Sequence, residues 1–133
     1  ADDILANCPI LPEGETRGGP QAGARQILIV RKATLYSANY VASINDTTPR
    51  SEFTIRCDGG PSPSSEVEVG FIRLVPPDSL RAPHYNPTRK WLRLWIDIAG
   101  MAQVLAQLQQ NHRYLWRGEF SNGHIYGDLH SSD

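Results

Sequence analysis

The chain has 133 residues and a formal net charge of −1, with 40% hydrophobic and 20% charged residues. This length favours one domain whose core needs neither metals nor several disulfides. The near-neutral charge excludes a general electrostatic attraction to nucleic acids or anionic membranes. No stretch approaches the roughly 18 consecutive apolar residues of a membrane-spanning helix, so we expect no membrane insertion.

Residues 1–24 contain three prolines and four glycines and show no hydrophobic periodicity. This composition predicts an irregular N-terminal arm in front of a single domain spanning 25–133. Cys8 and Cys57 are the only cysteines. They fit either one disulfide in an exported protein, secreted or periplasmic, or two unrelated thiols in a cytoplasmic one. The sequence leaves both interpretations open.

Strand patterns occur at 26–36, 40–44, 52–57, 66–75 and 90–97. In 66–75, one face would carry Val67, Val69, Phe71 and Val75. In 90–97 the alternation is strict, with Leu92, Leu94 and Ile96 on one face and Trp91, Arg93, Trp95 and Asp97 on the other, as in a half-buried strand. Residues 58–65 are rich in Gly, Pro and Ser and predict a loop, with Gly59-Gly60 as a turn.

Helical periodicity follows in 98–110, where Ile98, Met101, Ala102, Leu105 and Leu108 share a face. Asp97 is the predicted N-cap and Asn111 the predicted left-handed residue after the helix. No charged side chain occurs from Ile98 to His112. We interpret this helix as covering the sheet with a thin solvent-facing side; the alternative is that its uncharged side forms a homo-oligomer contact.

The C-terminal segment predicts a β-hairpin around Asn122-Gly123, a pair typical of a two-residue type I′ turn. This turn would pair Phe120 with Ile125, Trp116 with Leu129 and Arg117 with Asp128. Together, the patterns predict an α+β domain: a mostly antiparallel, bent sheet of about seven strands, with one long helix covering one face. They do not decide between an open sheet and a half-barrel.

The predicted polar face of the hairpin gathers the candidates for catalysis: Glu119, His124, Asp128 and His130. An imidazole beside carboxylates can transfer protons, and the same groups can bind a divalent metal, so a small hydrolase or metal-dependent enzyme is one alternative. Solvated hairpins commonly carry such residues, and zinc-type spacings and phosphate-binding glycine loops are missing from the sequence. We therefore expect a protein without cofactor or metal and favour a non-enzymatic role.

A second group of residues is aromatic and basic. Residues 81–93 carry four basic side chains and no acid. The predicted binding face consists of Arg89, Lys90, Trp91, Arg93, Trp95, Arg113, Arg117 and Tyr126. Such a mixture is typical of protein–protein hot spots, and also of surfaces that stack single-stranded nucleic acid. The net charge and the presence of only two lysines favour a protein partner, as for an inhibitor, immunity-type, adaptor or chaperone-like protein. A structural alternative is that the Trp side chains form a small second core.

Overall fold

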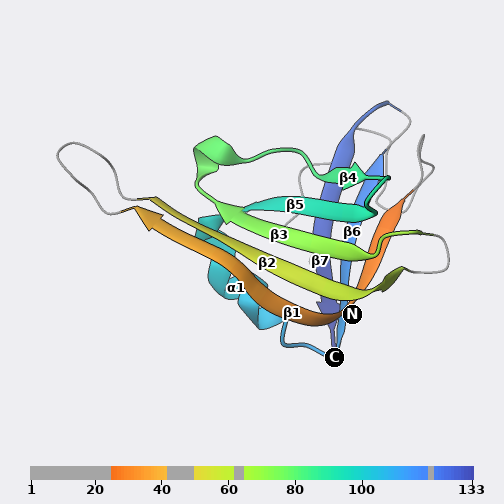
Figure 1. The fold of residues 1–133 in the computed structure, drawn as a ribbon, viewed down its shortest axis with the longest axis horizontal. Helices are drawn as coiled ribbons and strands as arrows, with labels where there is room; N and C mark the ends of the chain where they lie inside the picture. Colours follow the sequence, from red (N-terminus) through yellow and green to blue (C-terminus); the bar gives the residue numbers. More distant parts are fainter. Residues whose placement is uncertain (1–24, 42–49, 62–64, 120–121) are drawn as a thin grey trace.

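A computed structural model describes residues 25–41, 50–61, 65–119 and 122–133 (Figure 1). Its single sheet contains β1 (Gln26–Val41), β2 (Arg50–Pro61), β3 (Val69–Val75), β4 (His84–Asn86), β5 (Trp91–Asp97), β6 (His112–Glu119) and β7 (Ile125–Ser132). The described segments between the strands include the 3-10 turns η2 (Pro77–Ser79) and η3 (Ile98–Gly100) and the helix α1 (Met101–Gln107). The predicted arm 1–24, with Cys8, and most of the predicted strand 40–44 lie outside the described residues.

The strands follow the order β4-β5-β3-β2-β1-β6-β7 and curl into a half-barrel. All neighbouring strands are antiparallel except β3 and β5, which run parallel. The sheet is therefore mixed, and the prediction of a mostly antiparallel sheet with one helix is confirmed only in part. The parallel pair arises because residues 76–90 return the chain to the starting end of β3 before β5 begins.

The first strand is longer than its sequence pattern suggested. β1 continues past residue 36 to Val41, with register shifts against β2 at Val30/Lys32 and Leu35/Ser37 that allow it to bend. The prediction of a loop from residue 58 was wrong, because Asp58–Pro61 belong to β2 and pair with β1. A Cβ at Gly59 would overlap the Ile29 carbonyl, so this glycine permits a close backbone approach within the sheet and does not form a turn.

The core lies on the concave side of the curled sheet, where α1 covers part of it. It combines Leu28, Ile55, Ile72, Leu92, Leu94, Leu115 and Leu129 from the strands with Val104 and Leu108 from the helical segment. The predicted inward face of β5 is confirmed, since Leu92 and Leu94 are buried. β3 differs from its predicted pattern because it is buried on both faces: Ile72 and Leu74 face the core, while Phe71 lies on the outer side.

The helix is much shorter than predicted. Asp97 caps the segment as expected, its carboxylate accepting the Ala99 N–H at 2.9 Å, but the bond stabilises η3 and not an α-helix. α1 ends at Gln107, and Asn111 does not adopt a left-handed conformation. Its buried side is formed by Val104 and Leu108, whereas Leu105, predicted to face the core, is 44% exposed.

The C-terminal hairpin exists, but its predicted register was wrong by one residue. Trp116 faces Asp128, Leu115 faces Leu129, and the last pair is Glu119 with Ile125. The turn differs because Gly123 has a positive φ but Asn122 does not, and the Asn122 side chain accepts the His124 N–H. A one-residue shift exchanges the two faces, so Leu115 lies in the core and Trp116 lies on the opposite face of the hairpin, where it is half-buried. The predicted Arg117–Asp128 pair does not form.

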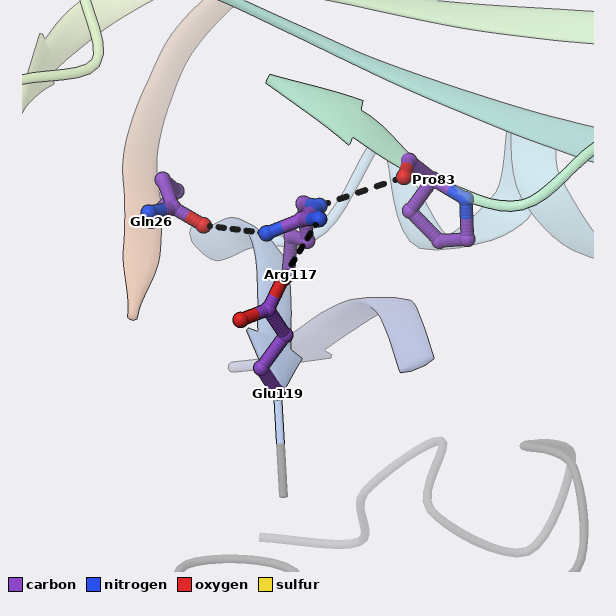
Figure 2. A network of polar contacts seen from close by, with 4 residues as sticks. All are labelled: Gln26, Pro83, Arg117 and Glu119. Carbon is purple, nitrogen blue, oxygen red and sulfur yellow. Dashed lines mark hydrogen bonds and ion pairs between the residues drawn. The ribbon is translucent and has the colours of Figure 1, made fainter. Parts of the chain in front are cut away.

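Arg117 instead joins the two halves of the curled sheet (Figure 2). Its Nε donates to the Pro83 carbonyl, just before β4, at 3.1 Å. Its Nη1 donates to Gln26 at the start of β1 at 3.0 Å, and its Nη2 pairs with Glu119 at 3.2 Å. The Arg117 side chain is only 13% exposed. These bonds therefore tie β6 to the segment before β4, which lies at the opposite end of the strand order.

Gly127 provides a second, apolar contact between the two ends of the curled sheet. A Cβ on this residue would lie 2.7 Å from Leu94 Cδ2, 2.7 Å from Pro83 Cγ and 3.0 Å from the Trp116 carbonyl oxygen. β7 can approach β5 this closely only because residue 127 lacks a side chain. We refer to the contacts of Arg117 and Gly127 with Pro83 and Leu94 as the closure seam.

We predict that Arg117→Ala lowers the free energy of unfolding by about 2–3 kcal/mol, because it removes charge-assisted hydrogen bonds in a largely buried setting. Urea unfolding followed by Trp fluorescence measures this. Arg31→Ala, which removes an exposed guanidinium, is the matched control and should change stability by less than about 0.5 kcal/mol. Equal losses of unfolding free energy in the two variants would contradict a stabilising role for the Arg117 hydrogen bonds.

We predict that Gly127→Ala lowers stability by about 1–3 kcal/mol, because the added methyl overpacks the seam. Gly60→Ala, also within a strand, places its methyl in open space and is the control. Thermal unfolding of both variants measures the difference. A Gly127→Ala protein as stable as Gly60→Ala would contradict the close approach of β7 to Leu94.

Candidate functional site

The predicted catalytic residues do not gather on one face. Glu119 points to the concave side and pairs with Arg117, whereas Asp128 and His130 lie on the other face of the hairpin. Asp128 is only 5% exposed, and the His130 ring lies 6.1 Å from that of Tyr114. His124 precedes β7 in the turn. Within the described residues, no group of three His, Cys, Asp or Glu side chains could hold a metal ion.

The predicted binding residues separate into two sets. Arg113 and Arg117 face the concave side, where Arg113 donates to the Leu108 carbonyl at 2.6 Å and the Arg31 carbonyl at 2.8 Å. Arg113 thus fastens the end of the helical segment to β1. Tyr126 is fully buried, and its ring lies 6.4 Å from that of Trp116. These three side chains are therefore part of the framework in this structure.

The remaining predicted residues lie on the outer, convex side of β5 or in the turn before it. Trp91 has the Arg89 guanidinium 4.9 Å and the Arg93 guanidinium 5.5 Å from its ring centre. Phe71 of β3 lies edge-on to Trp91 at 5.3 Å, and Tyr36 of β1 lies edge-on to Phe71 at 5.6 Å. We call these five residues, Tyr36, Phe71, Arg89, Trp91 and Arg93, the Trp91 cluster. Its members come from β1, β3, β5 and the turn before β5, and they share one outer surface.

The turn in front of β5 positions Arg89 over Trp91. The Asn86 side chain accepts the Thr88 N–H at 3.0 Å and the Arg89 N–H at 3.1 Å. Lys90 then adopts a left-handed φ of 60°, unusual for a non-glycine residue, and its carbonyl accepts the Glu68 N–H at 2.9 Å. The backbone is thus held on both sides of Arg89.

Free positive charge gathers around the cluster. Among the described residues, Arg73, Arg89 and Arg93 have no acidic side chain within ion-pair distance. Two other basic residues nearby are paired, Arg56 with Asp58 at 3.0 Å and Lys90 with Glu68 at 3.8 Å. Both pairs are well exposed and contribute little to stability. Three guanidinium groups therefore remain available beside an aromatic row.

Tyr36, Phe71 and Arg73 also belong to this surface, although they were not among the predicted binding residues. Phe71 had been placed on one face of its strand with Val67, Val69 and Val75, and Tyr36 lies within the second register shift of β1, between Leu35 and Ser37. Only the pairing of β2 with both neighbours, which places Arg56 opposite Phe71, brings them together. No short-range pattern contains that information.

Trp95, also a predicted binding residue, lies on the outer side of β5 but lines a separate groove of about 510 Å³. The groove runs between residues 80–83, the end of β5, α1 and β7. Its polar side chains come from several elements: Arg81, Asp97, Gln103, Gln107 and Asp128. The carboxylate of Asp97 already caps η3, so the groove presents no evident acid–base pair.

Cys57 is a fully buried free thiol in the core, and no disulfide is seen; its suggested partner Cys8 lies outside the described residues. Burial raises the pKa of the Cys57 thiol to about 12, outweighing the opposite influence of Arg113. The nucleophile in cysteine chemistry is the thiolate. A thiol so strongly held in its neutral form is not an activated nucleophile.

We predict that Cys57 reacts with iodoacetamide at pH about 8 at least about 100-fold more slowly in the folded protein than in urea. Peptide mass mapping measures alkylation at this residue. Because the folded state keeps a proton that the unfolded chain loses above its usual pKa of 9.0, stability should fall as pH rises from 9.0 toward about 12. Rapid alkylation of the folded protein, or a Cys8–Cys57 disulfide peptide, would contradict this assignment.

Comparison of the chain with protein-family models, curated proteins and solved structures found no match. Within the described ranges, no helix is long and apolar enough to cross a membrane.

Proposed function

We propose that this protein works by binding a protein partner through the convex sheet surface centred on the Trp91 cluster. The observation that supports this most is the arrangement of Arg89 and Arg93 beside the Trp91 ring, with Arg73 on the neighbouring strand. Trp, Tyr and Arg are the side chains most enriched in protein–protein hot spots. The charge of the surface indicates a partner with carboxylates at the contact.

The geometry favours a protein over single-stranded nucleic acid on this surface. Base stacking needs an open aromatic face. Phe71 is only 6% exposed, and the ring of Trp91 already has two guanidinium groups and Phe71 as neighbours. Tyr36, at 62% exposed, is the one ring of the cluster that is widely open. A single open ring does not form a platform for successive bases.

The positioned turn also supports recognition. The Asn86 side chain and the left-handed Lys90 hold the backbone around Arg89, which reduces the freedom that Arg89 would lose on binding. Arg guanidinium groups bind carboxylates in a planar, two-pronged geometry. A preorganised pair of such groups suits an acidic, well-defined protein surface.

We predict that the double substitution Arg89→Ala and Arg93→Ala weakens partner binding by about 30-fold or more, since hot-spot truncations typically cost 2 kcal/mol or more. Arg81→Ala is the matched control, because it removes one charge of the same basic segment without touching Trp91. The three proteins are immobilised and exposed to extract from the source cells. A polypeptide retained by wild type and Arg81→Ala but not by the double variant is then purified and titrated by calorimetry.

Two results would overturn the proposal. One is a purified partner that binds the double variant as tightly as wild type while both proteins keep the same unfolding midpoint. The other is binding of an oligothymidine probe to wild type that falls steeply with salt and is lost in the double variant. Such salt dependence reports release of counterions from phosphates, and would assign the surface to nucleic acid.

A further inference from the structure

The concave side of the β1–β2 pair carries a second, apolar surface. Beyond the core these two strands project past the rest of the sheet as an arm (Figure 1). Leu35, Ala38 and Tyr40 of β1 lie on its concave side, because they pair with or adjoin the inward-facing Ile55, Phe53 and Ser51 of β2. Leu35 is 61% and Tyr40 66% exposed. We call these three β1 residues the arm strip.

An apolar groove of about 270 Å³ lies at the base of this arm. It is bounded by Leu35 and Phe53 of the arm and by Met101, Leu105 and Leu108 of the helical segment. Among the described residues that line it, none has a charged side chain. Leu105 stands at its edge with 44% exposure, next to the exposed Ala102 and Ala106 on the outer side of α1.

We infer that this surface is covered by a second copy of the same chain, in a two-fold dimer in which the arm strip of each copy packs on α1 and the groove of the other. Projecting apolar side chains and an apolar groove occur on the same chain. Such a pair is self-complementary under a two-fold rotation, which brings each arm onto the other copy's groove. Both contacts form at once in a closed dimer.

The charge pattern agrees with this occupant. The segment from Ile98 through Asn111 has only apolar and uncharged polar side chains, and the arm strip has none that is charged. An acidic or basic partner would gain no electrostatic energy there. The arm strip of a second copy is itself uncharged and apolar, so it can pack on the groove without burying a charge. The small side chains of Ala102 and Ala106 also allow another backbone to approach closely.

The arm itself needs support. A two-stranded ribbon is marginally stable on its own in water. All described side chains from Thr34 to Tyr40 are exposed, so the single chain gives this part of β1 little packing. A dimer would bury its concave side and leave the Trp91 cluster free, since that cluster lies on the convex side. The inference is therefore independent of the proposed function.

Analytical ultracentrifugation of the full chain over a wide concentration range tests the dimer. Wild type should sediment with twice the mass of the single chain. Leu105→Glu and Leu35→Lys should each raise the dimer dissociation constant by at least about tenfold, because each places a charge in a desolvated apolar contact. Leu80→Glu is the matched control: Leu80 is equally exposed at 45% but lies outside the arm strip and groove, so this variant should stay dimeric.

A mixing experiment tests the arm-on-helix geometry. Leu35→Lys and Leu105→Glu chains, each mainly monomeric alone, should form a mixed dimer, because one contact gains a Lys–Glu pair and the other keeps both leucines. A monomeric wild type would overturn the inference. This holds even if its groove binds an apolar dye and Leu105→Glu abolishes that binding, because the groove would then take a different ligand. Dissociation by Leu80→Glu as large as that by Leu105→Glu, or no mixed dimer, would overturn it as well.

Discussion

The closure seam is the contact on which the shape of this molecule depends. β4 and β7 are the two outer strands of the sheet, and no strand pairing joins them. The sheet stays curled because Arg117 reaches across to the Pro83 carbonyl and because Gly127 lets β7 lie against Leu94. This curvature encloses the concave core under α1, while the alternation of side chains along β3 and β5 places Phe71 and Trp91 on the opposite, convex side.

Local patterns in the sequence predicted which segments form strands and a helix better than where these elements begin and end and which side chains they bury. The alternation in β5 identified its buried Leu92 and Leu94 and its outward Trp91 and Arg93, because burial on one face of a strand leaves a period of two. The same rule failed for β3, whose two faces are both covered. Helical periodicity extended to residue 110, but the segment begins as a 3-10 turn and its α-helical part ends at Gln107.

The site was predictable only in its local part. Arg89, Trp91 and Arg93 are close in sequence and meet in the structure. Arg113, Arg117 and Tyr126 were expected beside them from the assumed hairpin register and the assumed neighbourhood of β5 and β6. In the structure three strands separate β5 from β6 in the sheet, and the register differs by one residue. Such long-range order depends on loop conformations and on packing of the whole chain, which short motifs do not record.

The closed half-barrel is tested most directly by nuclear Overhauser spectra of the isotope-labelled protein that record both backbone and methyl protons. The structure predicts strong cross-peaks from the Gly127 α-protons to the Leu94 methyl groups, together with cross-strand contacts that pair Trp116 with Asp128. These contacts fix both the closure seam and the faces of the hairpin. Cross-peaks that pair Trp116 with Leu129, with none between Gly127 and Leu94, would contradict the closed half-barrel.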